Sequence, residues 1–338
     1  MRLSLVLLPL LCGVAAAQTT TSHLFLQHDP LTITLETDLH ALTHDRGKER
    51  KDHPGILRYG AGADTGSLAV KLRTRGIFRL RMCGFPPIRL DLPKHNVAGT
   101  PFAGEDRLKL VTHCQKDRLS EHNLLREYAL YRAFNAVTDT SFRARLVHVT
   151  YIDSLRHDTL TRYGILIESD TALATRIEAT PLRADNLYDP IMDPPYMTLV
   201  AIFQYLIGNN DWSVRGRHNM AVFQKTADPK PLLAVPYDFD FSGAVNAPYA
   251  TPPPQVPIKT VRQRFYRGFC KPDSLVMAAV TRFQTAKDSM YANVGAVPDL
   301  PEGDVRNVLG YFDEFYDVLK NRGAVNREFV RNCRQLPT

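Results

Sequence analysis

The sequence predicts an α+β fold in two parts, a strand-rich first half that contains one helix and a mostly helical second half. In the first half, apolar and polar residues alternate over strand lengths between turn-rich pieces. Beyond about residue 170 the apolar residues recur mainly at helical spacing. We therefore expect the boundary between the two parts at residues 168–172.

The first half carries six strand-like segments and one helical stripe. Residues 120–135 place Leu124, Tyr128 and Tyr131 on one face, and Ser120 is a suitable N-cap residue for this helix. The strand-like segments are residues 31–38, 67–76, 87–93, 107–113, 143–153 and 163–169.

The second half begins with an apolar helix at residues 197–208, which Gly208 is expected to end. Two short strands follow at residues 220–224 and 232–236, and amphipathic helices at 274–291 and 305–321 complete the chain. The proline-rich segment "NAPYATPPPQVPIKT", between the second of these strands and the first of these helices, cannot be a helix or a central strand. We expect it to be irregular and on the surface.

The first 17 residues have the layout of an export signal. "MRLSLVLLPLLCGVAAA" combines one Arg, an apolar run and small residues before an expected cleavage near Ala17. No later segment reaches the roughly 20 apolar residues of a membrane-spanning helix. We therefore expect a secreted or periplasmic protein without a transmembrane segment.

Cysteine spacing and charge narrow the function classes. The four cysteines beyond the signal permit two disulfides in three pairings, and proximity in the chain favours Cys83 with Cys114 and Cys270 with Cys333. The formal net charge of +7 is modest, and the basic residues are spread along the chain. A nucleic-acid partner is therefore not predicted.

Chemistry-bearing residues gather in "GNNDWSVRGRHNMAVFQ" and "LLAVPYDFDFSG". A buried helix, a polar loop, a hairpin and a pair of aspartates follow one another. Phosphoryl transfer needs an Asp near the attacking hydroxyl, and an Asn and an Asp on the metal that bridges the phosphates. Asp211, Asn219 and Asp238 or Asp240 fit these positions.

Three residues of the first half fit the same chemistry. Protein kinases hold the phosphates with a strand Lys that pairs with a Glu on the next helix. Lys109 in "RLKLVTH" and Glu127 in "LLREYALY" occupy those places in order. Glu168 in "YGILIESD" lies where a hinge against the adenine would be expected.

The chain resembles the CotH kinase-like family of atypical secreted or spore-coat kinases, and more distantly HipA-type kinases. "VKLRTRG", "PIRLDLP" and "PYDFDFSG" carry the resemblance, which covers residues 67–245. It implies a two-lobed protein-kinase-like fold that uses ATP with Mg²⁺ or Mn²⁺ to phosphorylate an exported protein. It also implies Asp211 as the catalytic residue, Asn219 and Asp238 as metal ligands, and Arg75–Gly76 near the phosphates.

The resemblance divides the chain into a signal peptide, an N-terminal extension with strands and two lobes. The expected bounds are residues 1–17, 18–66, 67–169 for the N-lobe and 170–338 for the C-lobe.

Several alternatives stay open at this point. Asp211 and Asn219 are eight residues apart, whereas eukaryotic protein kinases space these residues by five, so a kinase-shaped binding or coat protein without activity is the main rival. A second alternative is the transfer of AMP or another group by the same residues. The stretch "GAGADTG" at 60–66 resembles a phosphate loop but is interpreted as a connection, and "DFDFSG" lacks the later acidic ligands of a calcium loop.

Overall fold

The computed structural model describes residues 23–60, 65–93, 97–184 and 187–336. The predicted export signal at residues 1–17 lies outside these ranges, as does most of the glycine-rich stretch at 60–66.

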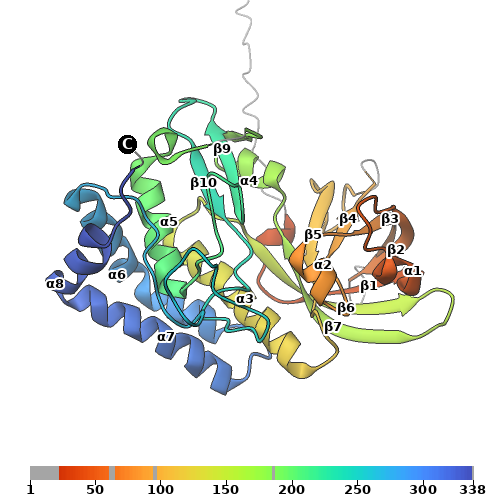
Figure 1. The fold of residues 1–338 in the computed structure, drawn as a ribbon. Helices are drawn as coiled ribbons and strands as arrows, with labels where there is room; N and C mark the ends of the chain where they lie inside the picture. The colour runs from red at the N-terminus through yellow and green to blue at the C-terminus, as the bar shows by residue number, and fades with distance from the viewer. Residues whose placement is uncertain (1–22, 61–64, 94–96, 185–186, 337–338) are drawn as a thin grey trace, which may run out of the picture.

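The first half of the chain forms a closed seven-stranded β-barrel (Figure 1). Its strands follow one another around the barrel in the order β1-β2-β3-β4-β5-β7-β6. All neighbours are antiparallel except β1 and β6, whose parallel pairing closes the barrel. The strands are β1 (Leu31–Thr37), β2 (His53–Tyr59), β3 (Gly66–Thr74), β4 (Ile88–Asp91), β5 (Arg107–Val111), β6 (Ala144–Asp153) and β7 (Thr159–Ile167).

This architecture is not the two-lobed protein-kinase-like fold with a mostly helical C-lobe that the sequence suggested, and that prediction was wrong. The barrel includes β1 and β2, which precede residue 67, and one core of alternate inward side chains fills it, among them Leu35, Leu57 and Leu90. Alternation along a strand predicts a buried face. It carries no information on whether the first strand pairs with a distant one and closes the sheet.

The second half packs helices around a three-stranded antiparallel sheet in the order β10-β9-β8. Figure 1 shows this part beside the barrel, with α3 lying between the two. The strands are β8 (Ala179–Pro181), β9 (Met220–Lys225) and β10 (Leu233–Pro236). The main helices are α3 (Arg118–Val137), α5 (Pro194–Ile207), α6 (Asp273–Gly295) and α7 (Glu302–Lys320).

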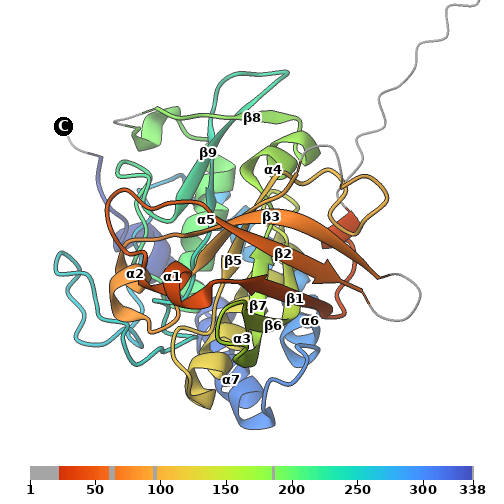
Figure 2. The same cartoon turned by 90° about the vertical axis from the view of Figure 1, so that its right-hand side faces the viewer.

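The shorter helices were not predicted. They lie mostly in connections, where four to seven residues are too few for a helical period to show. Figure 2 turns the barrel toward the viewer and shows α1 and α2 beside its strands. The short helices and turns are α1 (Leu39–His44), α2 (Phe78–Met82), α4 (Asp170–Arg176), α8 (Arg322–Val325), 3₁₀ turns at His23–Phe25 and Asp189–Ile191, and a π-helical turn at Asn326–Arg331.

Both disulfides favoured by the sequence are present, Cys83–Cys114 and Cys270–Cys333. Such bridges fit a secreted or extracellular protein. No helix in the described ranges is both long enough and apolar enough to cross a membrane. The proline-rich segment between β10 and α6 contains no helix or strand, as predicted.

Candidate functional site

The predicted catalytic loop follows the C-terminus of α5. Asp193 caps the start of this helix, and Gly208 ends it with a left-handed backbone (φ +66°) that favours glycine. The side chain of Asn209 then accepts a hydrogen bond from the backbone N–H of Asp211 (2.9 Å). The loop therefore leaves a rigid, buried helix with Asp211 held in place from its first residues.

The eight-residue spacing between Asp211 and Asn219 does not separate them. Ser213 and His218 exchange two backbone hydrogen bonds of 2.9 Å, which fold the intervening residues into a closed turn. The Asn219 amide nitrogen donates to the backbone oxygen of Asp211 (2.8 Å) and to its carboxylate (3.1 Å). The extra residues form a projecting turn, and the two side chains remain in contact.

His218 holds the other carboxylate oxygen of Asp211. The distance from its Nε2 atom to Oδ1 of Asp211 is 2.9 Å, and this hydrogen bond raises the pKa of His218 against the effect of partial burial. Asp211 is thus oriented by an imidazole on one side and by an amide on the other.

Asn219 and Asp238 meet at the end of the β9–β10 hairpin. Met220 pairs with Pro236 in the register, and the backbone oxygen of Asn219 accepts a hydrogen bond from Tyr237 (3.1 Å). Both residues have left-handed backbones, with φ of +53° for Asn219 and +64° for Asp238. Such conformations in residues other than glycine are uncommon and gather at functional sites.

The side-chain oxygens of Asp238 and Asn219 at this hairpin end have no partner in the part of the chain that the structure describes. Within the described ranges, the half-buried carboxylate of Asp238 accepts no hydrogen bond and forms no ion pair, although its backbone N–H donates to the Tyr131 hydroxyl (2.8 Å). The amide oxygen of Asn219 likewise accepts no hydrogen bond from these residues. Oxygen atoms that the protein leaves unpaired near a second carboxylate, here that of Asp211, are suited to a cation or a polar ligand.

A second group of charges lies immediately behind Asp238. The guanidinium of Arg79 is 3.6 Å from the carboxylate of Glu127 and 4.0 Å from that of Asp240, and all three side chains are buried. Burial, together with the charge of Asp238, raises the pKa of Asp240 to about 7. Burial and the charge of Asp240 raise the pKa of Glu127 well above its usual range, although Arg79 opposes the shift. Strand β10 ends at Pro236, and the charges of Asp238 and Asp240 beyond it act on each other.

Arg79 was not predicted from the sequence. It lies on the short helix α2, which the Cys83–Cys114 disulfide links to the end of β5. The guanidinium also donates to the backbone oxygen of Thr112 (2.5 Å). Arg81 on the same helix is exposed, so residue type alone could not distinguish the functional arginine from its neighbour.

Lys109 is near the site but does not pair with Glu127. Its ammonium is 2.9 Å from the carboxylate of Asp170 and 4.8 Å from the ring centre of Tyr237, the residue before Asp238. Burial lowers the pKa of Lys109, opposed by Asp170. The predicted Lys–Glu pair is replaced by Lys109–Asp170 and Arg79–Glu127.

The three remaining predicted residues differ in their relation to the site. The charge of Arg75 lowers the pKa of Lys109, which places the two cations near each other. Gly76, directly after it, is exposed with φ +86°. Glu168 is occupied elsewhere, because its carboxylate pairs with Arg176 (2.7 and 3.0 Å) and accepts the N–H of Arg143 (3.0 Å).

The side chains of the site could hold a divalent cation whose remaining ligands are waters or a bound substrate. Within the described ranges, no three His, Cys, Asp or Glu side chains come together as a metal cage. Mg²⁺ commonly uses one or two carboxylates, waters and substrate phosphates in place of such a cage. Asp238, the amide oxygen of Asn219 and Asp240 are the groups here that would hold it.

No protein-family model matches the chain, and no curated protein matches it either.

Proposed function

We propose that this protein transfers a phosphoryl group from ATP to a hydroxyl group of an exported protein, with Mg²⁺ or Mn²⁺ as cofactor. The observation that carries the proposal is the unpaired oxygen set of Asp238 and Asn219 beside Asp211. Phosphoryl transfer depends on positioned carboxylates, an amide and cations more than on covalent chemistry.

Each residue has a role that follows from its surroundings. Asp211, oriented by His218 and Asn219, would accept a hydrogen bond or a proton from the attacking hydroxyl. Lys109 and Arg75 are the cations that would meet the phosphates. A metal bound by Asp238 and Asn219 would neutralise phosphate charge.

The CotH-like identity is proposed from the order of sequence motifs and not from the fold. Export by an N-terminal signal cleaved near Ala17 is a further part of the proposal, and the two disulfides support it.

Two variants separate binding from transfer. Asp238→Asn removes a charged metal ligand and is expected to weaken metal-dependent binding of a fluorescent ATP analogue at least tenfold. Asp211→Asn leaves that ligand intact and is expected to bind normally, while phosphoryl transfer to the protein itself or to an added hydroxyl-rich polypeptide falls at least a hundredfold. Normal transfer by both variants would reject the proposed roles.

The second candidate function is that of a binding protein that holds the nucleotide without phosphoryl transfer. It is favoured by the neutralisation of Glu127 and Asp240 by Arg79, which lets these carboxylates serve a structural role without metal. In that case the nucleotide analogue would bind to the parent and to Asp211→Asn alike, and no phosphoryl transfer would be measured with either.

A further inference from the structure

A second cavity lies beside the Asp211 loop, and its lining includes none of Asp211, Asn219, Asp238 and Asp240. It has a volume of about 560 Å³ and is lined by the residues that follow Asp211, by the start of α5 and by the chain around Cys270. Pockets for small organic ligands usually have about 300–1,000 Å³. The cavity is therefore large enough for a ligand of one or two rings.

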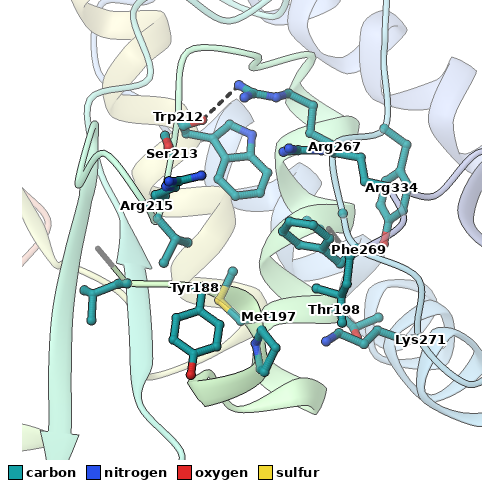
Figure 3. A pocket seen from close by; sticks show the side chains of 17 residues that line it. Tyr188, Met197, Thr198, Trp212, Ser213, Arg215, Arg267, Phe269, Lys271 and Arg334 are labelled. Carbon is teal, nitrogen blue, oxygen red and sulfur yellow. Dashed lines mark hydrogen bonds between the residues drawn. The ribbon is translucent and has the colours of Figure 1, made fainter. Parts of the chain in front are cut away.

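Its walls are apolar and aromatic. Figure 3 shows Trp212, Phe269, Tyr188 and Met197 around a common space, with Arg215 on one side and Arg267 and Arg334 on the other. Trp212 is mostly buried, and its indole N–H has no hydrogen-bond partner among the described residues. Aromatic and apolar walls of this kind suit the flat body of an apolar ligand.

The charge that lines the cavity has one sign. Arg215, Arg267, Lys271 and Arg334 contribute to the lining, whereas no Asp or Glu does so within the described part of the chain. Arg215 forms no hydrogen bond or ion pair with any described residue. Burial and the neighbouring charge of Arg334 lower the pKa of Arg267 to about 10, and the charge of Asp211 opposes this shift.

The basic wall is held rigidly. Arg267 donates to the backbone oxygens of Asn210 and Trp212, the latter at 2.8 Å. Arg334 stacks its guanidinium on Phe269 (4.8 Å from the ring centre), and the Cys270–Cys333 disulfide joins their two chain segments. Arg267 and Arg334 are thus fixed in place before a ligand arrives, which reduces the entropy lost on binding.

We propose that this cavity binds an organic anion with an aromatic or branched apolar body, with Arg215, Arg267 and Arg334 around its carboxylate, sulfonate or phosphate. Two kinds of ligand have this chemistry. One is a free small anion, and the other is a polypeptide segment with an acidic side chain next to an apolar one. The proposal does not rest on phosphoryl transfer, because it uses none of the residues of that site.

The protein contains one tryptophan, so fluorescence excited selectively at tryptophan comes from this cavity wall. The test titrates the full chain with 1-anilinonaphthalene-8-sulfonate and, separately, with N-phenyl-1-naphthylamine, which has the same rings without the sulfonate. Trp212 emission is expected to be quenched by the sulfonate at least tenfold more tightly than by the neutral compound. Raising the salt concentration should weaken the binding of the sulfonate and not that of the neutral probe.

The matched variants are Arg215→Gln and Arg334→Gln in the cavity and Arg306→Gln, an exposed arginine on α7, as the control. Each cavity variant is expected to weaken binding of the sulfonate about tenfold, and the control should not change it. Equal binding of the two probes, or equal affinities in cavity variants and control, would overturn the proposal.

Displacement of the bound sulfonate distinguishes the two sources. Stronger displacement by 4-phenylbutyrate would assign the cavity to free small anions, and stronger displacement by the blocked dipeptide acetyl-Phe-Glu-amide would assign it to polypeptides. If neither displaces the probe, the cavity does not take this class of ligand and the proposal is wrong.

Discussion

At the scale of single residues, Arg79 determines whether two carboxylates can be buried behind Asp238. It is the cation next to both Glu127 and Asp240. Removing one partner from a buried ionic cluster leaves uncompensated charge and typically costs about 3–5 kcal/mol.

Arg79→Gln is therefore expected to lower the free energy of unfolding by about 3 kcal/mol or more. Arg81→Gln, on the same short helix but exposed, is the control and should leave stability nearly unchanged. The measurement is urea unfolding at neutral pH. Equal losses in the two variants would show that helix α2, and not the buried charge, sets the effect.

The residues of the loop were predictable because residue type and order are local. The sequence alone predicts Asp211, Asn219 and Asp238 as candidates, and this remains a prediction. The partners of Glu127 and Lys109 were not predictable, because a pairing between side chains from separate elements depends on how α2, α3 and α4 pack. The positive φ of Asp238, which brings its charge near Asp240, also left no mark in the sequence.

At the scale of elements, the end of α5 fixes the start of the loop that carries Asp211. Gly208 has φ +66°, and a Cβ atom added there would lie 2.0 Å from the hydroxyl of the buried Tyr311. Gly208→Ala is therefore expected to destabilise the protein by about 2 kcal/mol or more.

Gly310→Ala on helix α7 is the matched control. A Cβ atom there would meet nothing within 4 Å, so this change should stabilise the protein by about 0.5–1 kcal/mol. Thermal unfolding of both variants checks the pair. A Gly208→Ala protein as stable as the parent would mean that the loop does not need this backbone conformation.

Most long elements were predicted at nearly their observed bounds, since their periods extend over many residues. Strand β2 was missed because it begins with "HPG", residues typical of turns. Its pairing with both β1 and β3 makes this segment a strand despite its composition.

At the scale of the whole molecule, closure of the barrel could not be predicted. The parallel pairing of β1 with β6 joins segments far apart in the chain, and no local pattern encodes it. The same closed barrel buries His113 completely between Phe85 and Tyr151.

Burial lowers the pKa of His113 to about 4, assisted by the charges of Arg162 and Arg79. In the unfolded chain the imidazole has a pKa near 6.5, so the unfolded state binds more protons between these values. Stability from this residue is complete above about pH 6.5 and is lost as the pH falls toward 4, by about 3 kcal/mol. Urea unfolding from pH 4 to 8 should show this loss in the parent and a flatter curve in His113→Gln; parallel curves would contradict it.

The central claim is that the end of the β9–β10 hairpin binds a metal–nucleotide complex. The most direct test is the thermal midpoint of the protein with and without ATP plus Mg²⁺ or Mn²⁺, for the parent, Asp238→Asn and Asp228→Asn. Asp228 is exposed in the connection at the other end of the hairpin and is the control. At 100 times its dissociation constant the ligand should stabilise the parent and the control by about 2.7 kcal/mol, and Asp238→Asn much less. No metal-dependent rise in the parent, or an equal rise in Asp238→Asn, would contradict the claim.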